Sequence, residues 1–125
     1  MRSLILIVDD NVDLLLNLQI TLEFNDYGVI SAENGKEAIK ILRELDHLPK
    51  LIISDILMPE MDGYELFNAI SENPRWSSVP FLFLTAYSPV KDDLMANKIN
   101  EIDIIIKPFS EVELLRIISD KIIKK

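Results

Sequence analysis

The chain has no cysteine among its 125 residues, so disulfide bonds and thiolate metal sites are excluded. Glycine is scarce too: Gly28, Gly35 and Gly63 are scattered and form no loop of the kind that cradles nucleotide phosphates. Basic side chains are outnumbered, 13 against 21 acidic ones, and the formal charge of −8 opposes binding to nucleic acid. The composition therefore disfavours a disulfide-rich protein, a P-loop nucleotide switch and a direct DNA binder.

Long hydrophobic runs are missing as well. The N-terminal run Leu4–Val8 is too short for a membrane span or a signal-peptide core, and two aspartates follow it. We therefore expect a cytoplasmic protein without a membrane partner. Apolar residues still make up 49% of the chain, enough to form the core of one globular domain over residues 1–125.

Five short apolar runs are typical of β-strands. They are Leu4–Val8, Tyr27–Ser31, Leu51–Ser54, Phe81–Leu84 and Ile102–Ile106. Four of them are nearly continuous rather than alternating, which is typical of strands that are covered on both faces. Segments with helical spacing lie between the runs, so strand and helix alternate. This alternation predicts an α/β fold, a doubly wound five-stranded parallel sheet with right-handed crossovers and helices on both faces.

Helix starts are marked by capping residues. Three pairs have the spacing of a capping box: Asn34 with Glu37, Asp62 with Glu65, and Ser110 with Glu113. Ser88 followed by Pro89 fits the N-cap and the first residue of a fourth helix. These signals complete a (βα)5 arrangement.

Charged and hydroxyl side chains follow the predicted strands. In a doubly wound sheet, ligands bind outside the carboxyl ends of the strands, near the point where the strand order reverses. The first run ends in Asp9-Asp10, the third in Asp55, the fourth in Thr85 and the fifth in Lys107. With the flavodoxin-like strand order 2-1-3-4-5, the aspartates converge at the reversal point and the other two side chains follow on neighbouring strands.

Three crowded carboxylates repel one another and raise one another's pKa unless a cation lies among them. Oxygen-only ligands favour Mg²⁺, which accepts a few carboxylates and keeps water or phosphate oxygens. An aspartate can then attack phosphorus, while Lys107 neutralises the phosphoryl oxygens and Thr85 donates a hydrogen bond. Taken singly, Asp10 is equally well explained as a helix cap and the others as structural or solvated side chains. Their conjunction favours phosphoryl chemistry.

This ordered set closely resembles the receiver domains of two-component response regulators, the CheY-like family, over essentially the whole chain. The matching motifs are Ile7-Val8-Asp9-Asp10-Asn11, Asn34-Gly35-Lys36-Glu37-Ala38, Asp55-Ile56-Leu57-Met58-Pro59-Glu60-Met61-Asp62-Gly63-Tyr64-Glu65-Leu66, Pro80-Phe81, Leu84-Thr85-Ala86 and Lys107-Pro108-Phe109.

The resemblance implies a role for each site residue. Asp55 is the expected phosphoacceptor, Lys107 contacts the phosphoryl group, and Thr85 moves toward it as part of a conformational switch. The ligands expected for Mg²⁺ are Asp10, Asp55, the main-chain carbonyl of Leu57 and, through water, Asp9. The peptide bond between Lys107 and Pro108 is expected to be cis.

The resemblance also implies partners. A sensor histidine kinase or a phosphotransfer protein supplies the phosphoryl group, because the lone His47 has no context in which to act as the donor. The phosphorylated domain then controls an effector protein or domain, through the surface of helix 4, strand 5 and helix 5, or forms a homodimer. It is a phosphoacceptor that assists its own phosphorylation and dephosphorylation rather than an enzyme.

The chain departs from the family pattern at two positions. Ile104 stands where the family commonly has an aromatic residue that rotates on activation, which puts an aromatic switch in doubt. Asn100 stands where a glycine often ends the fourth helix, and asparagine also tolerates the left-handed conformation of a helix end.

Two alternatives stay open. A small-molecule aspartyl phosphatase of the haloacid-dehalogenase type needs an Asp-x-Asp motif after the first strand, but Asn11 follows Asp9 by two residues. Such enzymes also carry a cap domain or long insertions, for which the chain has no room. The second alternative is a phosphorylation-independent interaction module that keeps the fold, although retention of all five site residues argues against it.

Overall fold

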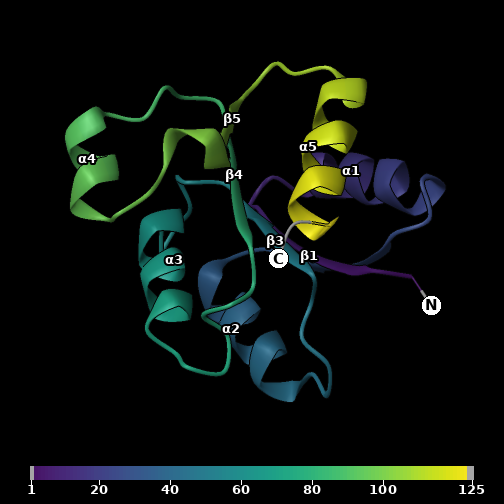
Figure 1. Cartoon of the computed structure of the whole chain (residues 1–125), viewed down its shortest axis with the longest axis horizontal. Coiled ribbons are helices and arrows are strands. Elements are labelled where there is room, and N and C mark those ends of the chain that lie inside the picture. The colour runs from purple at the N-terminus through teal and green to yellow at the C-terminus, as the bar shows by residue number, and fades with distance from the viewer. Residues whose placement is uncertain (1, 124–125) are drawn as a thin grey trace.

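The computed structural model describes residues 2–123 and has an α/β architecture (Figure 1). The strands are β1 (Leu4–Val8), β2 (Gly28–Ala32), β3 (Leu51–Ser54), β4 (Phe81–Thr85) and β5 (Ile104–Ile106). The helices are α1 (Val12–Phe24), α2 (Gly35–Glu44), α3 (Gly63–Ser71), α4 (Lys91–Ala96) and α5 (Glu111–Ile123), with a short 3-10 helix η1 (Glu101–Asp103) before β5. All strand pairs are parallel and the order is β2-β1-β3-β4-β5, so the predicted doubly wound fold is confirmed.

Helices cover both faces of the sheet, with α2 and α3 on one side and α1 and α5 on the other (Figure 1). In β1, Leu6 and Val8 belong to the core that includes residues of α2, α3 and α4, whereas Ile5 and Ile7 belong to the core shared with α1 and α5. Successive strand residues point to opposite faces, so burial on both faces explains the nearly continuous apolar runs. The polar site is consequently confined to the strand ends.

Side chains cap three helices where the sequence predicts it. Each of these N-caps accepts a hydrogen bond from the main-chain N–H three residues further on: Asn34, Asp62 and Ser110. At α3 the capping box is reciprocal, because Glu65 accepts a hydrogen bond from the Asp62 N–H at 3.0 Å. At α2, Glu37 instead accepts from the N–H of Glu33. Within residues 2–123, no helix combines the length and the apolar character needed to cross a membrane.

The predicted start of the fourth helix is wrong. The helix begins at Lys91, two residues after Pro89, and its N-cap is Val90 rather than Ser88. Val90 is extended, with φ −73° and ψ 134°, and makes no side-chain cap bond. The fixed φ of proline fits an extended chain as well as the first turn of a helix, so the Ser-Pro pair does not by itself determine where α4 starts.

The predicted end of α4 also differs. Lys98, with φ 58°, adopts the left-handed conformation, whereas Asn100 is extended. The Lys98 N–H donates to the Met95 carbonyl at 3.2 Å, and the Ile99 N–H donates to the Leu94 carbonyl at 2.8 Å. This pair of bonds is the Schellman arrangement, which requires a left-handed residue directly after the C-cap, and here that residue is Lys98.

Strand ends differ from the prediction by one or two residues. β2 is Gly28–Ala32 rather than Tyr27–Ser31, and β4 extends to Thr85. β5 starts at Ile104, because Ile102 lies in η1, where its N–H donates to the Oδ1 of Asn100 at 3.1 Å. Ile102 is 76% exposed, so its apolar side chain is not part of the buried sheet although it lies in the predicted strand.

Candidate functional site

Acidic and basic side chains meet at the carboxyl ends of β1, β3 and β5. Carboxylate oxygens of Asp9, Asp10 and Asp55, one from each residue, all lie within 4.8 Å of one another. The Nζ of Lys107 lies 3.4 Å from the Oδ2 of Asp9 and 4.0 Å from the Oδ2 of Asp55. The structure therefore brings four of the predicted site residues together at the point where the strand order reverses.

Main-chain pairing sets this arrangement. The Asp55 N–H donates to the Val8 carbonyl at 3.0 Å, so β1 and β3 end at the same level and Asp9 leaves the sheet beside Asp55. The Lys107 N–H donates to the Thr85 carbonyl at 2.7 Å, which ties the end of β5 to the end of β4. The site is thus held by the ladder of the sheet itself.

The three aspartates differ in their surroundings. Asp9 is buried, Asp55 is half-buried and Asp10 is exposed. Burial raises the pKa of Asp9 and the Asp55 carboxylate raises it further, against a hydrogen bond from the Asn11 N–H at 2.9 Å and the nearby charge of Lys107. The negative charge of Asp9 is therefore unfavourable in this setting, and an added cation would relieve it.

The donor set fits a hard divalent cation. The three clustered side chains offer only carboxylate oxygens, which Mg²⁺ prefers. Leu57 lies in the loop that follows Asp55, with a side chain that is 54% exposed. His47 precedes β3, at the opposite end of the strand from Asp55, and its side chain is exposed.

Thr85 is the last residue of β4 and is fully buried. Its Oγ1 accepts a hydrogen bond from the Tyr87 N–H at 3.3 Å, so the hydroxyl is engaged with the connection between β4 and α4. The peptide bond between Lys107 and Pro108 is cis, as expected. Ile104 begins β5 and packs, half-buried, against the core on the side of α2 and α3.

Gly63, the first residue of α3, belongs to the site although sequence reasoning missed it. A Cβ at this position would lie 2.2 Å from the Asp55 carbonyl oxygen and 2.8 Å from the Cα of Ile56. The Gly63 N–H donates to the Ile56 carbonyl at 2.7 Å, and the Ile56 N–H donates to the Oδ1 of Asp55 at 2.7 Å. The signal was a glycine directly after the capping Asp62, in a predicted helix, because glycine has a low helix propensity and so needs another reason to stand there.

Similarity to known proteins agrees with this geometry. The response regulator receiver domain family matches residues 5–119. A 14.6 kDa protein from the sodA1 3′ region of Leptolyngbya boryana is 40% identical over 114 residues, which cover 91% of this chain and 86% of that protein. The probable transcriptional regulator ycf27 of Porphyridium aerugineum is 37% identical over 113 residues, which cover 90% of this chain. The chain spans about half the length of that regulator, because the match covers 45% of it.

A solved receiver domain structure is also similar to this chain. The signal receiver domain of a signal transduction histidine kinase from Syntrophus aciditrophicus superposes with a TM-score of 0.85 at 34% identity, covering 98% of this chain and 93% of that one. The chain therefore belongs to the response regulator receiver domain family, the signalling domains of two-component systems.

Proposed function

We propose that Asp55 accepts a phosphoryl group from a phosphohistidine of a sensor histidine kinase or of a phosphotransfer protein, in a reaction that requires Mg²⁺. The observation that carries the proposal is the cluster of three aspartate carboxylates with the Lys107 ammonium at one end of the sheet. Membership of the receiver domain family supports it.

The transfer forms a bond between an Asp55 carboxylate oxygen and phosphorus and breaks the phosphorus–nitrogen bond of the donor, whose imidazole keeps the electron pair. The Oδ1 of Asp55 accepts the Ile56 N–H, whereas Oδ2 faces Lys107. We therefore assign Oδ2 as the nucleophile. The Lys107 ammonium neutralises negative charge on the phosphoryl oxygens, which lowers the barrier to attack by an anion.

Four groups would hold the metal ion: Asp10, Asp55, the Leu57 main-chain carbonyl and, through water, Asp9. When bound, Mg²⁺ supplies positive charge that neutralises the carboxylates and the phosphoryl oxygens together. Burial and the neighbouring Asp55 carboxylate raise the pKa of Asp9, which supports this assignment because a cation among the carboxylates would offset both effects.

The output begins at Thr85, whose hydroxyl turns toward the phosphoryl group and donates a hydrogen bond to it. Thr85 lies one strand from Asp55 and is bonded to the start of the connection to α4. We propose that the change spreads to the surface of α4, β5 and α5, where an effector protein or domain, or a second copy of the chain, binds. Direct contact with nucleic acid is not expected at a formal charge of −8.

The proposal is tested with a small phosphodonor, or with beryllofluoride, in the presence of Mg²⁺. We expect an intact mass increased by one phosphoryl group with the donor, and shifted amide resonances with beryllofluoride. Asp55→Asn and removal of the metal with a chelator should each abolish both effects. Asp62→Asn is the matched control, because it changes a capping aspartate of the same loop to an equally good cap and should keep both.

A native protein that gives neither response would overturn the proposal. That outcome would favour the second candidate, an interaction module that works without phosphorylation.

A further inference from the structure

We propose that the hydrogen bond between Asn68 of α3 and Asn97 of α4 is a latch that holds α4 in its resting position and opposes phosphoryl binding at Asp55. The Nδ2 of Asn68 donates to the Oδ1 of Asn97 at 2.7 Å in a partly buried setting. The two residues are 29 positions apart in the chain. The inference rests on the proposed function of Asp55 and extends it to the control of α4.

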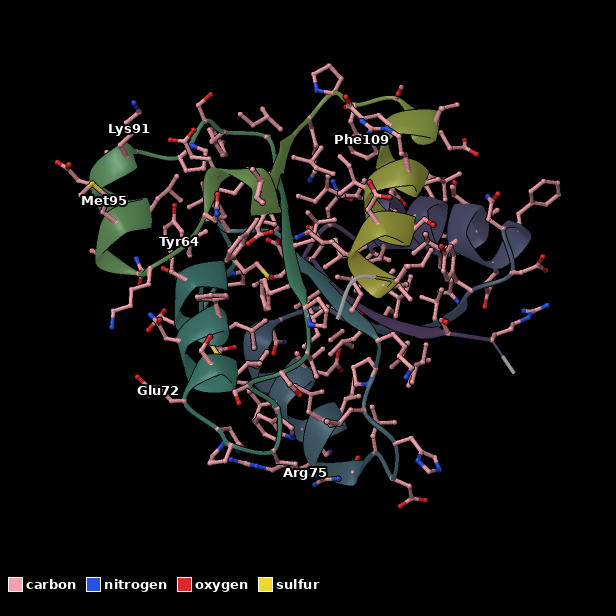
Figure 2. All side chains as sticks on the ribbon, viewed as in Figure 1. Tyr64, Glu72, Arg75, Lys91, Met95 and Phe109 are labelled. Atoms are coloured by element: carbon pink, nitrogen blue, oxygen red, sulfur yellow. The ribbon has the colours of Figure 1, made fainter. Side chains whose placement is uncertain are left out.

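α4 has few other restraints. It has six residues, a length at which a helix is not stable by itself. Its N-cap, Val90, makes no side-chain cap bond, and Leu94 is its buried residue. Met95 is 77% exposed, and it points away from α3 in Figure 2, as does the labelled Lys91 at the start of the helix. The position of α4 therefore depends on Leu94 and on its polar contacts.

The two asparagines are oriented for this contact. Asn97 is the C-cap of α4, and its Nδ2 donates to the Asp93 carbonyl at 2.8 Å, which leaves its Oδ1 for Asn68. One turn earlier on α3, Tyr64 lies at the top of that helix and beside the lower turn of α4 in Figure 2. Burial raises the pKa of Tyr64, and the charges of Asp93 and Asp62 raise it further. The boundary between α3 and α4 is thus partly polar, and within residues 2–123 the latch is the side-chain hydrogen bond that joins the two helices.

The two latched helices are attached to different parts of the site. α3 starts at Gly63, whose N–H donates to the Ile56 carbonyl at 2.7 Å, so this helix is fixed to the loop that carries Asp55. α4 follows Thr85 through the short connection of residues 86–90. The latch therefore joins the helix that follows the acceptor to the helix that follows Thr85.

This attachment couples the latch to the phosphoryl group. The Oγ1 of Thr85 accepts the Tyr87 N–H in the resting structure. When the hydroxyl turns toward a phosphoryl group on Asp55, this bond is lost and the connection to α4 rearranges. A displacement of α4 then breaks the bond between Asn68 and Asn97, so the latch favours the resting state.

The expected effect of the latch on ligand binding follows from the strength of a single neutral hydrogen bond. A neutral side-chain hydrogen bond shifts a conformational equilibrium by about two- to tenfold. Loss of the latch should therefore tighten the binding of beryllofluoride, measured at a fixed concentration of Mg²⁺, by about two- to tenfold.

Three variants test the latch. Asn68→Ala removes the bond between the helices. Asn97→Ala removes the same bond from the side of α4, together with the cap bond to the Asp93 carbonyl. Asn25→Ala is the matched control, since Asn25 is the C-cap of α1 and donates to the Thr21 carbonyl at 2.8 Å, as Asn97 does within α4.

Titration with beryllofluoride, followed by amide resonances, should show tighter binding for Asn68→Ala and Asn97→Ala, and native affinity for Asn25→Ala. Unchanged or weaker binding in Asn68→Ala overturns the latch. Amide hydrogen exchange of Lys91–Ala96 without ligand should be faster in Asn68→Ala than in the native protein, and unchanged exchange also overturns it. If the native protein binds no beryllofluoride, the proposed function of Asp55 fails, and the exchange rates alone decide whether the bond holds α4.

Discussion

The β1–α1 unit and the β4–α4 unit end in the same way but differ in how firmly their helices are held. Both helices have an asparagine C-cap, Asn25 or Asn97, followed by a left-handed residue, Asp26 or Lys98. α1 has 13 residues, a cap bond from Asn11 and three buried leucines. α4 has six residues, no side-chain bond at its N-cap and one buried leucine. The same helix ending therefore occurs in a helix that is stabilised along its length and in one that depends on a few contacts.

This difference matches the roles that we propose for the two units. α1 follows Asp9 and Asp10, which must keep their positions if they are to hold a cation. α4 follows Thr85, which must change its hydrogen bond during the response. A short, weakly capped helix is easier to displace, because less buried surface and fewer bonds are lost when it moves.

The largest effects should come from removing one buried leucine of each helix. Leu18→Ala in α1 should lower the free energy of unfolding of the whole protein by about 2–5 kcal/mol, measured by denaturant titration. Leu94→Ala should release α4 locally, so the amides of Lys91–Ala96 exchange much faster while the global unfolding midpoint falls less. Equal losses of global stability in the two variants would contradict the difference between the helices.

A second effect concerns the charge of Asp9 at the end of β1. Its pKa is raised in the folded protein, so between the ordinary value of 3.8 and the raised value the folded state binds more protons than the unfolded state. The free energy of unfolding therefore falls as pH rises through this window, and the charge remains a cost at neutral pH without metal. Asp9→Asn should raise the melting temperature at pH 7 in the presence of a chelator.

The same variant should lose this advantage at pH 3, where the native carboxyl is protonated in both states. Added Mg²⁺ should stabilise the native protein more than Asp9→Asn, because the variant lacks one carboxylate of the cluster. A variant that melts below the native protein at pH 7 without metal would show that the ion pair with Lys107 outweighs the burial of Asp9.

The smallest effects should come from changing the N-cap residue of each helix. Asn11→Ala removes the cap of α1 and should cost about 1 kcal/mol of global stability. Val90→Asp gives α4 a capping carboxylate near the positive end of the helix and should stabilise it locally by up to about 1 kcal/mol. Slower amide exchange of Lys91–Ala96 in Val90→Asp, but not in Val90→Ala, would confirm the effect. Unchanged exchange would show that capping does not limit the stability of α4.

The sequence by itself determined the order of the elements and the membership of the charged cluster. Continuous apolar runs indicate strands buried on both faces, and strict alternation with helices leaves few topologies. Parallel strands then carry Asp9, Asp55 and Lys107 to the same end of the sheet. Capping side chains such as Asp62 were also predictable, because each one bonds to a main-chain group only three residues away.

The tertiary structure decided the features that depend on contacts between distant segments. The glycine at the start of α3 was a local signal, but only the folded chain shows that Gly63 makes room for the Asp55 carbonyl, and that Asn68 bonds to Asn97 from 29 residues away. The errors in the helix start, the helix end and the strand start near α4 and β5 have the same origin. Short elements carry little local information, so their limits are set by the packing and hydrogen bonds that only the folded chain provides.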